Sequence, residues 1–550
     1  MATPSEAKPA APRAWLTVLA VLAAAAVLGI AWLTLRTPAE LGTAFHFKPD
    51  SCEYTLIADT CLREGRLGFR LNDLVYPSRY LPWFSLSILL PAEWLTGDVR
   101  GAAAGVNIMS MLALVLAMLA GRRAAGSGAG VLAAAAVFGY PAFAFYGGTA
   151  MTEVPYTALT FLVLWRYQIL CTRIEPRRRD WLILGLLIAW CGAVRGTGYL
   201  LLALPLLAWS ELKKPEERHA ALPLLLAPTV LMLLAGMAYN FLLFGTPLRG
   251  GYAYWCPVPY DYPQLVFGLG YLKTNLALMT AEPVVPAAAL ALATAALAYF
   301  AKAGQEKERG GAWEALHRFW LYTGVTTALV YLPYFYFDGR LWLPFGALSM
   351  LTAAVNIAAV LERLLRRAPS AAILLLLAAA VGWSVFVKRG FNRPPEFVTY
   401  EINMLKYCRE AIPDGGILLT SSDPAMATRF FVDRSQRRIF PLLRWPEYVD
   451  KVVMKRRLAH PEPFPAHAAD HRSPAILAAG IAPFPKVLEE NPEELDRMLK
   501  EDAPVYISSF ELEQRVGEAL KRRMLERANF IKAAQSRWCV LYRLKPRQRH

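Results

Sequence analysis

Charged residues are scarce in this chain of 550 residues. Only 19% of them are Asp, Glu, Lys or Arg, whereas about a quarter is usual for a soluble protein. Seven cysteines form neither a disulfide scaffold nor a CxxC metal site, and the chain has no GxGxxG motif, no P-loop and no internal repeat. It also lacks a Lys/Arg-rich arm with interleaved aromatics. These absences exclude an ordinary soluble enzyme, a disordered or fibrous protein and a nucleic-acid binder.

Hydrophobic residues make up 56% of the chain, so the surplus apolar side chains must face lipid. A bilayer core needs about 20 apolar residues in a helix. About eleven runs approach this length: 15–35, 101–120, 127–145, 154–170, 181–194, 197–210, 220–243, 283–301, 319–334, 341–360 and 371–387. The first run follows a start that resembles a signal peptide, but its length favours an uncleaved span. The sequence therefore predicts an α-helical polytopic membrane protein.

The excess of basic residues, +16 in formal charge, indicates how the chain is oriented. One set of loops between the runs is rich in Lys and Arg, including Arg122-Arg123 and Arg177 to Arg179, and the alternating set is nearly free of them. The positive-inside rule places the basic loops and the N-terminus in the cytoplasm. An odd number of spans then places the loop 37–98 and the tail 389–550 outside, although Lys388-Arg389 lies on the wrong flank for this rule.

The composition changes at about residue 389. Short β-branched runs at 416–420, 505–508 and 539–542 alternate with helical stretches such as 492–501 and 511–528. We therefore expect two parts: a transmembrane domain over 1–388, which includes the outer loop 37–98, and a soluble extracytoplasmic α/β domain over 389–550.

The polar residues of the loop 37–98 follow directly after the first run. Pro49-Asp50 begins a predicted helix in which Tyr54, Ile57 and Cys61 share one face. Asp50 and Glu53 have the spacing of a capping box, which would give them a structural role. Their place beyond a membrane span, near His46, favours instead a pair of functional carboxylates.

Three arginines and one further acid stand out at the outer ends of the spans. Arg340 and Arg195 lie where burying a lone cation is costly, so a function is expected, with snorkelling to the interface or pairing with Asp338 as the alternative for Arg340. Arg79 could be an ordinary surface charge, and Glu153 an acid favoured by the dipole at a helix start. Aromatics such as Tyr252 either contact a sugar or anchor the chain at the interface.

Several motifs in the predicted outer loops resemble one known family. Asp50, Tyr54, Ala58 and Gly65 follow the spacing D-x3-Y-x3-A-x6-G. Four other segments follow in the family's order: 152–155 (TEVP), 195–198 (RGTG), 240–252 and 338–344 (DGRLWLP). The region 1–390 thereby resembles the GT-C superfamily of membrane glycosyltransferases, in its family 39-like branch of protein O-mannosyltransferases and lipid A aminoarabinose transferases.

The resemblance implies a glycosyltransferase whose catalytic domain is 1–388 and whose active site is in the outer loop 37–98. Such an enzyme moves a sugar from a polyprenyl-phosphate donor to a lipid, glycan or protein acceptor at the outer face of the cytoplasmic membrane. Asp50 is the expected general base, because an attacking hydroxyl or amine needs a carboxylate to take its proton, and Glu53 is its substitute. Arg340, Arg195 and Arg79 are candidates for the departing phosphate.

Glu153, Tyr54 and Tyr252 are the remaining substrate-binding candidates. Some relatives bind a divalent metal such as Mg²⁺ or Mn²⁺ through acids in these loops, but Asp50 is not part of an Asp-x-Asp pair, so no metal ligands are assigned. Two other functions stay open: a transporter or flippase of lipid-linked sugar, and a ligase or polymerase of surface polysaccharide. The polar residues lie outside the first span and at span ends rather than at the midplane, which favours the transferase.

Overall fold

The computed structural model describes residues 14–36, 49–98, 100–173, 175–210, 215–255, 260, 266–301, 310–390, 397–432, 437–442, 486–501 and 503–547. His46, which the sequence analysis placed near the site, lies outside these residues.

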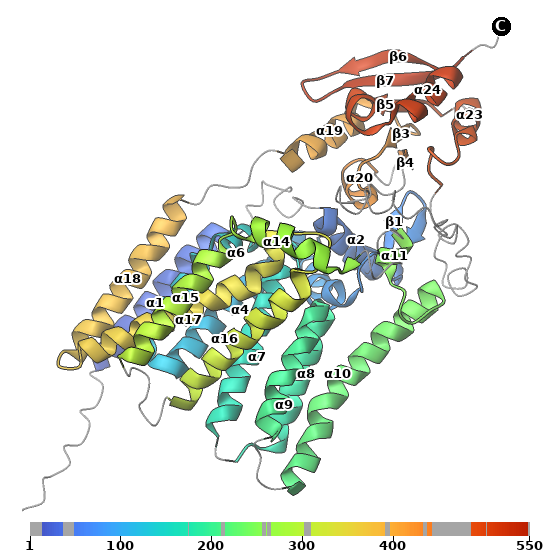
Figure 1. Cartoon of the computed structure of the whole chain (residues 1–550). Helices are drawn as coiled ribbons and strands as arrows, with labels where there is room; N and C mark the ends of the chain where they lie inside the picture. Colours follow the sequence, from blue (N-terminus) through green and yellow to red (C-terminus); the bar gives the residue numbers. More distant parts are fainter. Residues whose placement is uncertain are drawn as a thin grey trace, which may run out of the picture.

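Each apolar run of the sequence forms a helix, and these helices pack side by side in one bundle (Figure 1). Ala and Leu dominate the runs, and both favour helix. The bundle consists of α1 (Ala14–Leu35), α4 (Arg100–Ala125), α5 (Ser127–Phe138), α6 (Pro141–Tyr146), α7 (Glu153–Thr172), α8 (Arg178–Val194), η2 (Gly196–Leu202), α9 (Ala203–Ser210), α10 (Pro215–Phe244), α15 (Val284–Phe300), α16 (Gly310–Tyr331), α17 (Leu343–Leu364) and α18 (Pro369–Gly390).

Five helical segments of the described chain are long and apolar enough to cross a bilayer, so the protein is an integral membrane protein. They are Ala14–Leu35, Gly101–Ala125, His219–Phe244, Gly339–Leu364 and Pro369–Gly390. A sixth would be Leu269–Met279 with Val284–Phe300, which bend by 79° at their junction. Other runs form shorter helices, such as the 12 residues of α5, about 18 Å long. The number of eleven spans therefore stays a prediction.

Short elements gather at one end of the bundle, where the sequence has its polar loops (Figure 1). They are α2 (Pro49–Glu64), β1 (Phe69–Leu71), β2 (Leu74–Tyr76), η1 (Ser85–Leu89), α3 (Leu90–Thr96), α11 (Gly251–Trp255), η3 (Leu269–Tyr271), α14 (Leu272–Met279) and η4 (Gly339–Trp342). The predicted helix start at Pro49-Asp50 is confirmed.

The tail contains a mixed five-stranded sheet with the strand order β4-β3-β5-β7-β6. In it β3 pairs in parallel with β4 and β5, and β7 is antiparallel to β5 and β6. Its elements are α19 (Phe397–Ala411), β3 (Ile417–Thr420), α20 (Pro424–Phe430), β4 (Arg438–Pro441), α23 (Glu493–Lys500), β5 (Val505–Ser508), η6 (Glu511–Arg515), α24 (Glu518–Arg527), β6 (Ala528–Gln535) and β7 (Val540–Pro546). Strands lie at the three β-branched runs of the sequence.

The tail packs on α2 and on the β1–β2 hairpin. One buried apolar cluster contains Leu56 and Phe69 together with Leu405 and Met426 of the tail. In the hairpin turn, Asn72 has a positive φ of 54°. Its side chain donates to the Ile439 carbonyl and accepts from the Ile439 N–H, both at 3.0 Å, and so joins the hairpin to β4. The outer segment after α1 and the sheet therefore form one packed unit.

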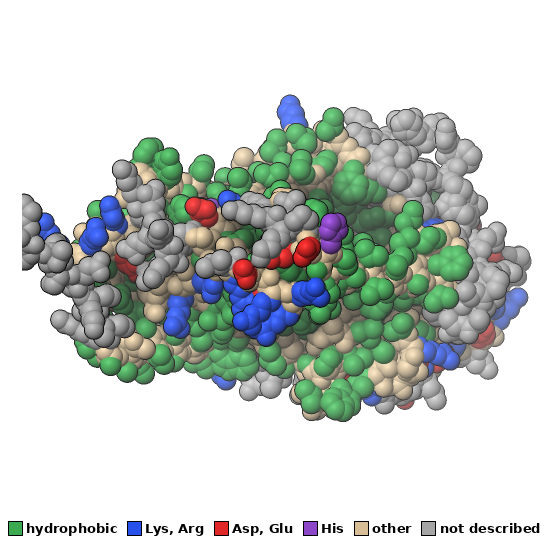
Figure 2. Space-filling model, turned by 90° about the horizontal axis from the view of Figure 1, so that it is seen from below, with side chains coloured by type: hydrophobic (Ala, Val, Ile, Leu, Met, Phe, Trp, Pro, Cys, Tyr) green, Lys and Arg blue, Asp and Glu red, His purple; other side chains and the backbone are tan. Residues whose placement is uncertain are grey.

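The opposite end of the bundle is basic. Figure 2 views this end and shows Lys and Arg side chains gathered at its centre, with a few acids, inside a largely hydrophobic surface. Arg123 in the last turn of α4 donates a hydrogen bond to Thr172 in the last turn of α7. Because α7 begins at Glu153 near the polar loops, these arginines lie about 30 Å away from them.

Candidate active site

A cavity of about 700 Å³ opens at the end of the bundle that faces the sheet. It collects side chains from segments that are far apart in the sequence. Seven of the eight predicted site residues line it: Asp50, Tyr54, Arg79, Glu153, Arg195, Tyr252 and Arg340. Glu53 does not line it.

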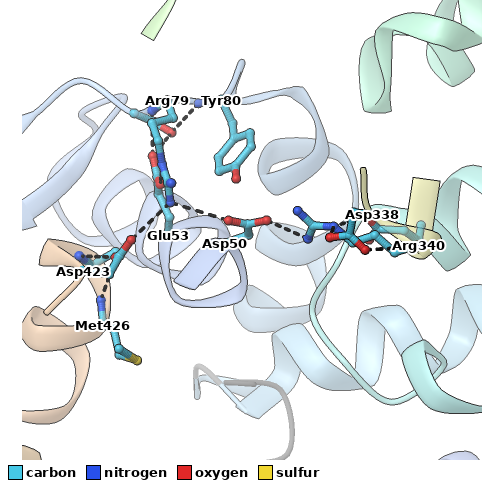
Figure 3. Close-up of polar contacts among 11 residues, drawn as sticks. Asp50, Glu53, Arg79, Tyr80, Asp338, Arg340, Asp423 and Met426 are labelled. Atoms are coloured by element: carbon cyan, nitrogen blue, oxygen red, sulfur yellow. Dashed lines mark hydrogen bonds and ion pairs between the residues drawn. The ribbon is translucent and has the colours of Figure 1, made fainter. Parts of the chain in front are cut away.

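Asp50 and Arg340 form an ion pair in the wall of this cavity (Figure 3). Asp50 lies in the first turn of α2, and its Oδ2 is 2.7 Å from Arg340 Nη1. Arg340 belongs to η4, whose N-cap Asp338 accepts from the Arg340 backbone N–H and lies 2.8 Å from the Arg340 Nε. Arg340 therefore makes both contacts: it pairs with Asp338, which was the alternative to a functional role, and it also pairs with Asp50.

Glu53 binds Arg79 and does not itself line the cavity (Figure 3). Its side chain is fully buried, and its oxygens accept from the Arg79 Nε at 2.7 Å, the Arg79 backbone N–H at 2.6 Å and the Ser78 hydroxyl at 2.7 Å. These contacts point away from the start of α2, so the capping-box interpretation is wrong. Arg79 is only 6% exposed, so its interpretation as an ordinary surface charge is also wrong.

Arg79 connects three carboxylates (Figure 3). Besides Glu53, its Nη2 lies 3.6 Å from Asp50 Oδ1 and 3.4 Å from Asp423 Oδ2. Asp423 belongs to the tail, where its Oδ1 caps α20 by accepting from the backbone N–H groups of Ala425 and Met426. The tail thereby contributes a carboxyl group to the surroundings of the site.

Glu153 and Arg195 form the second polar group of the cavity. Glu153 is buried in the first turn of α7, and its Oε1 lies 3.2 Å from Arg195 Nη1 and 3.7 Å from Arg340 Nε. Arg195 also donates from Nε to the Tyr331 hydroxyl at 3.2 Å. The other carboxylate oxygen, Oε2, is buried without a hydrogen-bond partner among the described residues. An unsatisfied buried acceptor is costly, so this oxygen is available for a donor on a ligand.

Aromatic rings line the space between the two polar groups. Tyr80 lies 4.4 Å from Tyr54 and 5.3 Å from Tyr252 between ring centroids. Gly251 makes this arrangement possible, because a Cβ there would lie 1.8 Å from the Ser78 carbonyl oxygen. Larger residues are thereby excluded where α11 packs against the loop that carries Arg79.

No protein-family model matches the sequence, and no curated protein matches it. Solved structures do match the fold. ArnT from Cupriavidus metallidurans, a GT-C lipid A aminoarabinose transferase, superposes with a TM-score of 0.53 in its apo state, at 11% identity over 96% of this chain and 98% of ArnT. Its complex with undecaprenyl phosphate gives the same TM-score at 12% identity and the same coverage. This chain has the GT-C fold.

A second structure with the GT-C fold also superposes on this chain. The Archaeoglobus fulgidus oligosaccharyltransferase, in complex with Zn and sulfate, matches with a TM-score of 0.50 at 15% identity, over 78% of this chain and 62% of that one. The resemblance to the GT-C superfamily that the outer-loop motifs indicate is therefore confirmed at the level of the fold.

The acids in this GT-C cavity do not fit a divalent metal site. The described residues contain no group of three or more His, Cys, Asp and Glu side chains that could hold a metal ion. Asp50, Glu153 and Asp338 are instead each within 4 Å of an arginine. Because cationic partners occupy the carboxylates that Mg²⁺ or Mn²⁺ would need, we derive no step through a metal.

Burial and charge act in opposite directions on Asp50. Burial by itself would raise the pKa of the carboxyl, but the positive charges of Arg340 and Arg79 outweigh it and hold the pKa at about 2. Asp50 is therefore ionised throughout the physiological pH range.

Three residues near the site were not proposed from the sequence as functional: Tyr80, Asp338 and Asp423. Tyr80 directly follows Arg79, and Asp338 belongs to the motif segment 338–344, so both stand beside predicted residues in the sequence. Asp423 had no such signal, because it comes close to Arg79 only through the packing of the tail.

Proposed function

We propose that this protein is a glycosyltransferase that moves a sugar from a polyprenyl-phosphate donor to an acceptor in the cavity between the helix bundle and the sheet. The observation that carries the proposal is the Asp50–Arg340 ion pair, which places a carboxylate and a phosphate-binding group 2.7 Å apart in the cavity wall. A related fold has been crystallised with undecaprenyl phosphate, which supports a lipid-linked donor.

Asp50 is the group that we assign to the acceptor. Its ionised carboxylate accepts a hydrogen bond from the acceptor's O–H or N–H and aligns the attacking atom with the anomeric carbon. As the new bond to the anomeric carbon forms, the attacking atom becomes strongly acidic, so even a carboxylate of low pKa takes its proton. The bond between the anomeric carbon and the phosphate oxygen breaks, and its electron pair leaves with the polyprenyl phosphate.

Arg340 and Arg195 are the groups that we assign to the phosphate. A guanidinium presents a planar fork of donors that fits phosphate oxygens. When a phosphate binds Arg340, it competes with Asp50 for the same positive charge. The pKa of Asp50 then rises toward its ordinary value, so that donor binding makes Asp50 a better base. Arg79, held by Glu53, keeps Asp50 in place from the other side, which gives Glu53 a positioning role.

Glu153, Tyr54 and Tyr252 are the groups that we assign to the sugar. The unpartnered Oε2 of Glu153 can accept from a sugar hydroxyl, and tyrosine rings offer apolar faces for the C–H face of a sugar ring. The surrounding rings of Tyr80 and Phe84 hold Tyr54 in place.

The orientation of the chain rests on its charge distribution. The arginine-rich end of the bundle is opposite to the cavity (Figures 1 and 2), and the positive-inside rule assigns such an end to the cytoplasm. We propose that the cavity and the tail, 389–550, lie on the extracytoplasmic side of the cytoplasmic membrane, with 1–388 as the transmembrane catalytic domain.

The experiment that tests the function is a transfer assay with purified full-length protein. Comparative mass spectrometry of envelope lipids, glycans and proteins, with and without the gene, first identifies the modified acceptor and the sugar. The assay then follows release of polyprenyl phosphate and labelling of that acceptor. Movement of lipid-linked sugar across vesicles without release of the carrier would replace the transferase by a flippase. Growth of a polysaccharide chain as the product would indicate a ligase or polymerase.

A further inference from the structure

A second cavity, of about 850 Å³, lies between α2 and the tail. Its walls come from the second half of α2, the β1–β2 hairpin, α20 and the start of β4. Asp59, which lines it, is nine residues after Asp50, or about 13 Å along the helix. The two cavities thus share α2 as a common wall.

Arginine dominates the lining of this second cavity. Six arginines contribute to it, against three acids: Arg63, Arg70, Arg409, Arg429, Arg437 and Arg438, with Asp59, Glu64 and Asp73. Two of the acids are matched, since Arg63 pairs with Asp59, and Arg70 Nε lies 2.8 Å from Glu64 Oε1. The lining therefore keeps a net positive charge.

Two neighbouring side chains of α20, Thr428 and Arg429, present polar groups to this cavity. Thr428 is 8% exposed, and its buried hydroxyl makes no hydrogen bond among the described residues. Arg429 follows it, and no described carboxylate lies within 4.0 Å of its guanidinium. Burial lowers the pKa of Arg429, since its charge is partly removed from water. A buried hydroxyl and a desolvated guanidinium side by side are costly unless a ligand satisfies them.

We infer that the second cavity binds a phosphate-bearing saccharide, with Arg429, Arg438 and the Thr428 hydroxyl contacting its phosphate. The guanidinium fork matches phosphate oxygens, and a threonine hydroxyl donates to them. The volume exceeds that of a phosphate ion and falls in the range of small-molecule sites. Only Leu56 and Val432 provide large apolar side chains, so the cavity is unsuited to a lipid tail.

The shared wall of α2 suggests where this ligand belongs. Asp59 lies about 13 Å from Asp50 along α2, a span that a short saccharide covers, so we assign the phosphate to the acceptor. This assignment rests on the proposed transferase function, whereas binding of the phosphate group itself does not.

Binding is tested first, by isothermal titration of the purified full-length protein with inorganic phosphate and with glucose 6-phosphate. Loss of one charge-assisted contact should weaken binding of both probes about tenfold or more in Arg429→Gln. Arg438→Gln should also weaken binding. Because Arg438 is at an exposed strand position, this variant tests the site even if the partly buried Arg429 is necessary for folding. Arg66→Gln is the matched control, because Arg66 is exposed in the loop between α2 and β1 and does not line the cavity.

The outcomes separate the inference from the proposed function. Arg340→Gln should leave binding of both probes at the second cavity unchanged, because Arg340 lines the other cavity. Unchanged affinity in both Arg429→Gln and Arg438→Gln, or equal weakening by Arg66→Gln, overturns the site. Binding that is lost in Arg340→Gln but kept in Arg429→Gln would move the phosphate to the first cavity and overturn the inference as well.

The source of the phosphate is tested in the transfer assay. If the acceptor carries it, inorganic phosphate raises the KM for the acceptor in the wild type and leaves kcat unchanged. In Arg429→Gln that KM is already about tenfold higher and added phosphate has little further effect. Inhibition that lowers kcat at an unchanged KM would show that an independent anion or a lipid headgroup binds here, and would overturn the assignment to the acceptor.

Discussion

Asp50 Oδ2 lies 2.7 Å from Arg340 Nη1, although the two residues are 290 positions apart in the sequence. One comes from α2, the helix that follows α1, and the other from the beginning of a late membrane span. Their contact joins the carboxylate that we assign to the acceptor with the guanidinium that we assign to the phosphate. The protonation state of Asp50 therefore depends on what is bound to Arg340.

Arg340→Gln should change both the rate and the pH profile of transfer. Loss of a donor to the departing phosphate is expected to lower kcat about 10²–10³-fold. Because Arg340 is the strongest charge that lowers the pKa of Asp50, its removal raises that pKa above about 2. The loss of kcat/KM on acidification should then begin at a higher pH than in the wild type. Identical acid limbs in the two proteins would contradict the coupling.

Asp50→Asn should abolish proton transfer while it preserves donor binding. We expect a decrease of about 10²–10⁴-fold in kcat, the usual range for a general base, with a nearly unchanged affinity for the polyprenyl-phosphate donor. Single-turnover assays and donor titration measure the two quantities. Asp98→Asn, at an exposed position outside the cavity, is the control and should keep full activity. Substantial turnover by Asp50→Asn would rule out Asp50 as the base.

Asp423→Asn should change how stability depends on pH. Burial raises the pKa of Asp423 to about 8, although the charge of Arg79 acts in the opposite direction. Between about pH 4 and pH 8 the folded state keeps a proton that the unfolded state has lost. The wild type therefore loses stability as the pH rises through this range. Asparagine remains a good N-cap but does not titrate, so this part of the decline should be absent in the variant.

Thermal unfolding in detergent between pH 5 and pH 9 measures this difference. The control is Asp414→Asn, which removes a 65% exposed acid from the same region and should leave the decline in place. Parallel curves for Asp423→Asn and the wild type would show that Asp423 is already ionised at low pH.

Arg79→Gln should destabilise the site more than removal of an exposed ion pair would. It leaves the buried carboxylate of Glu53 without its cation, and loss of one partner of a buried pair costs about 3–5 kcal/mol. The double variant Arg79→Gln/Glu53→Gln should recover part of this loss, because no uncompensated Glu53 charge remains. Thermal unfolding measures both, and an additive double variant would contradict the assigned coupling.

Asn72 should hold the hairpin to the sheet. Asn72→Ala loses both hydrogen bonds to Ile439 and places at the positive φ a residue that tolerates this conformation less well than Asn does. Asn72→Gly loses the hydrogen bonds alone, so it should be less destabilising by about 1 kcal/mol. Hydrogen exchange of the β4 amides reports the opening, which should be faster in both variants. Unchanged protection of β4 would show that the apolar cluster alone holds the tail in place.

The sequence by itself determined the local features of this protein. Apolar runs of Ala and Leu dictate helices, because an unpaired backbone in lipid is too costly. Pro49-Asp50 marks a helix start, and the short β-branched runs of the tail mark strands. The polar motifs of the sequence identified seven residues of the cavity wall. A charged side chain at the end of an apolar helix is costly to bury, so its presence indicates a function.

Only the tertiary structure decided which charges meet. It turned Glu53 away from the cavity and under Arg79, and it buried Arg79, which its sequence neighbourhood could not distinguish from a surface residue. It brought Asp423 to Arg79 and placed Thr428 and Arg429 beside α2 across a second cavity. The reason is physical: helix and strand patterns depend on neighbours a few positions apart, whereas burial and ion pairing depend on contacts between segments hundreds of residues apart.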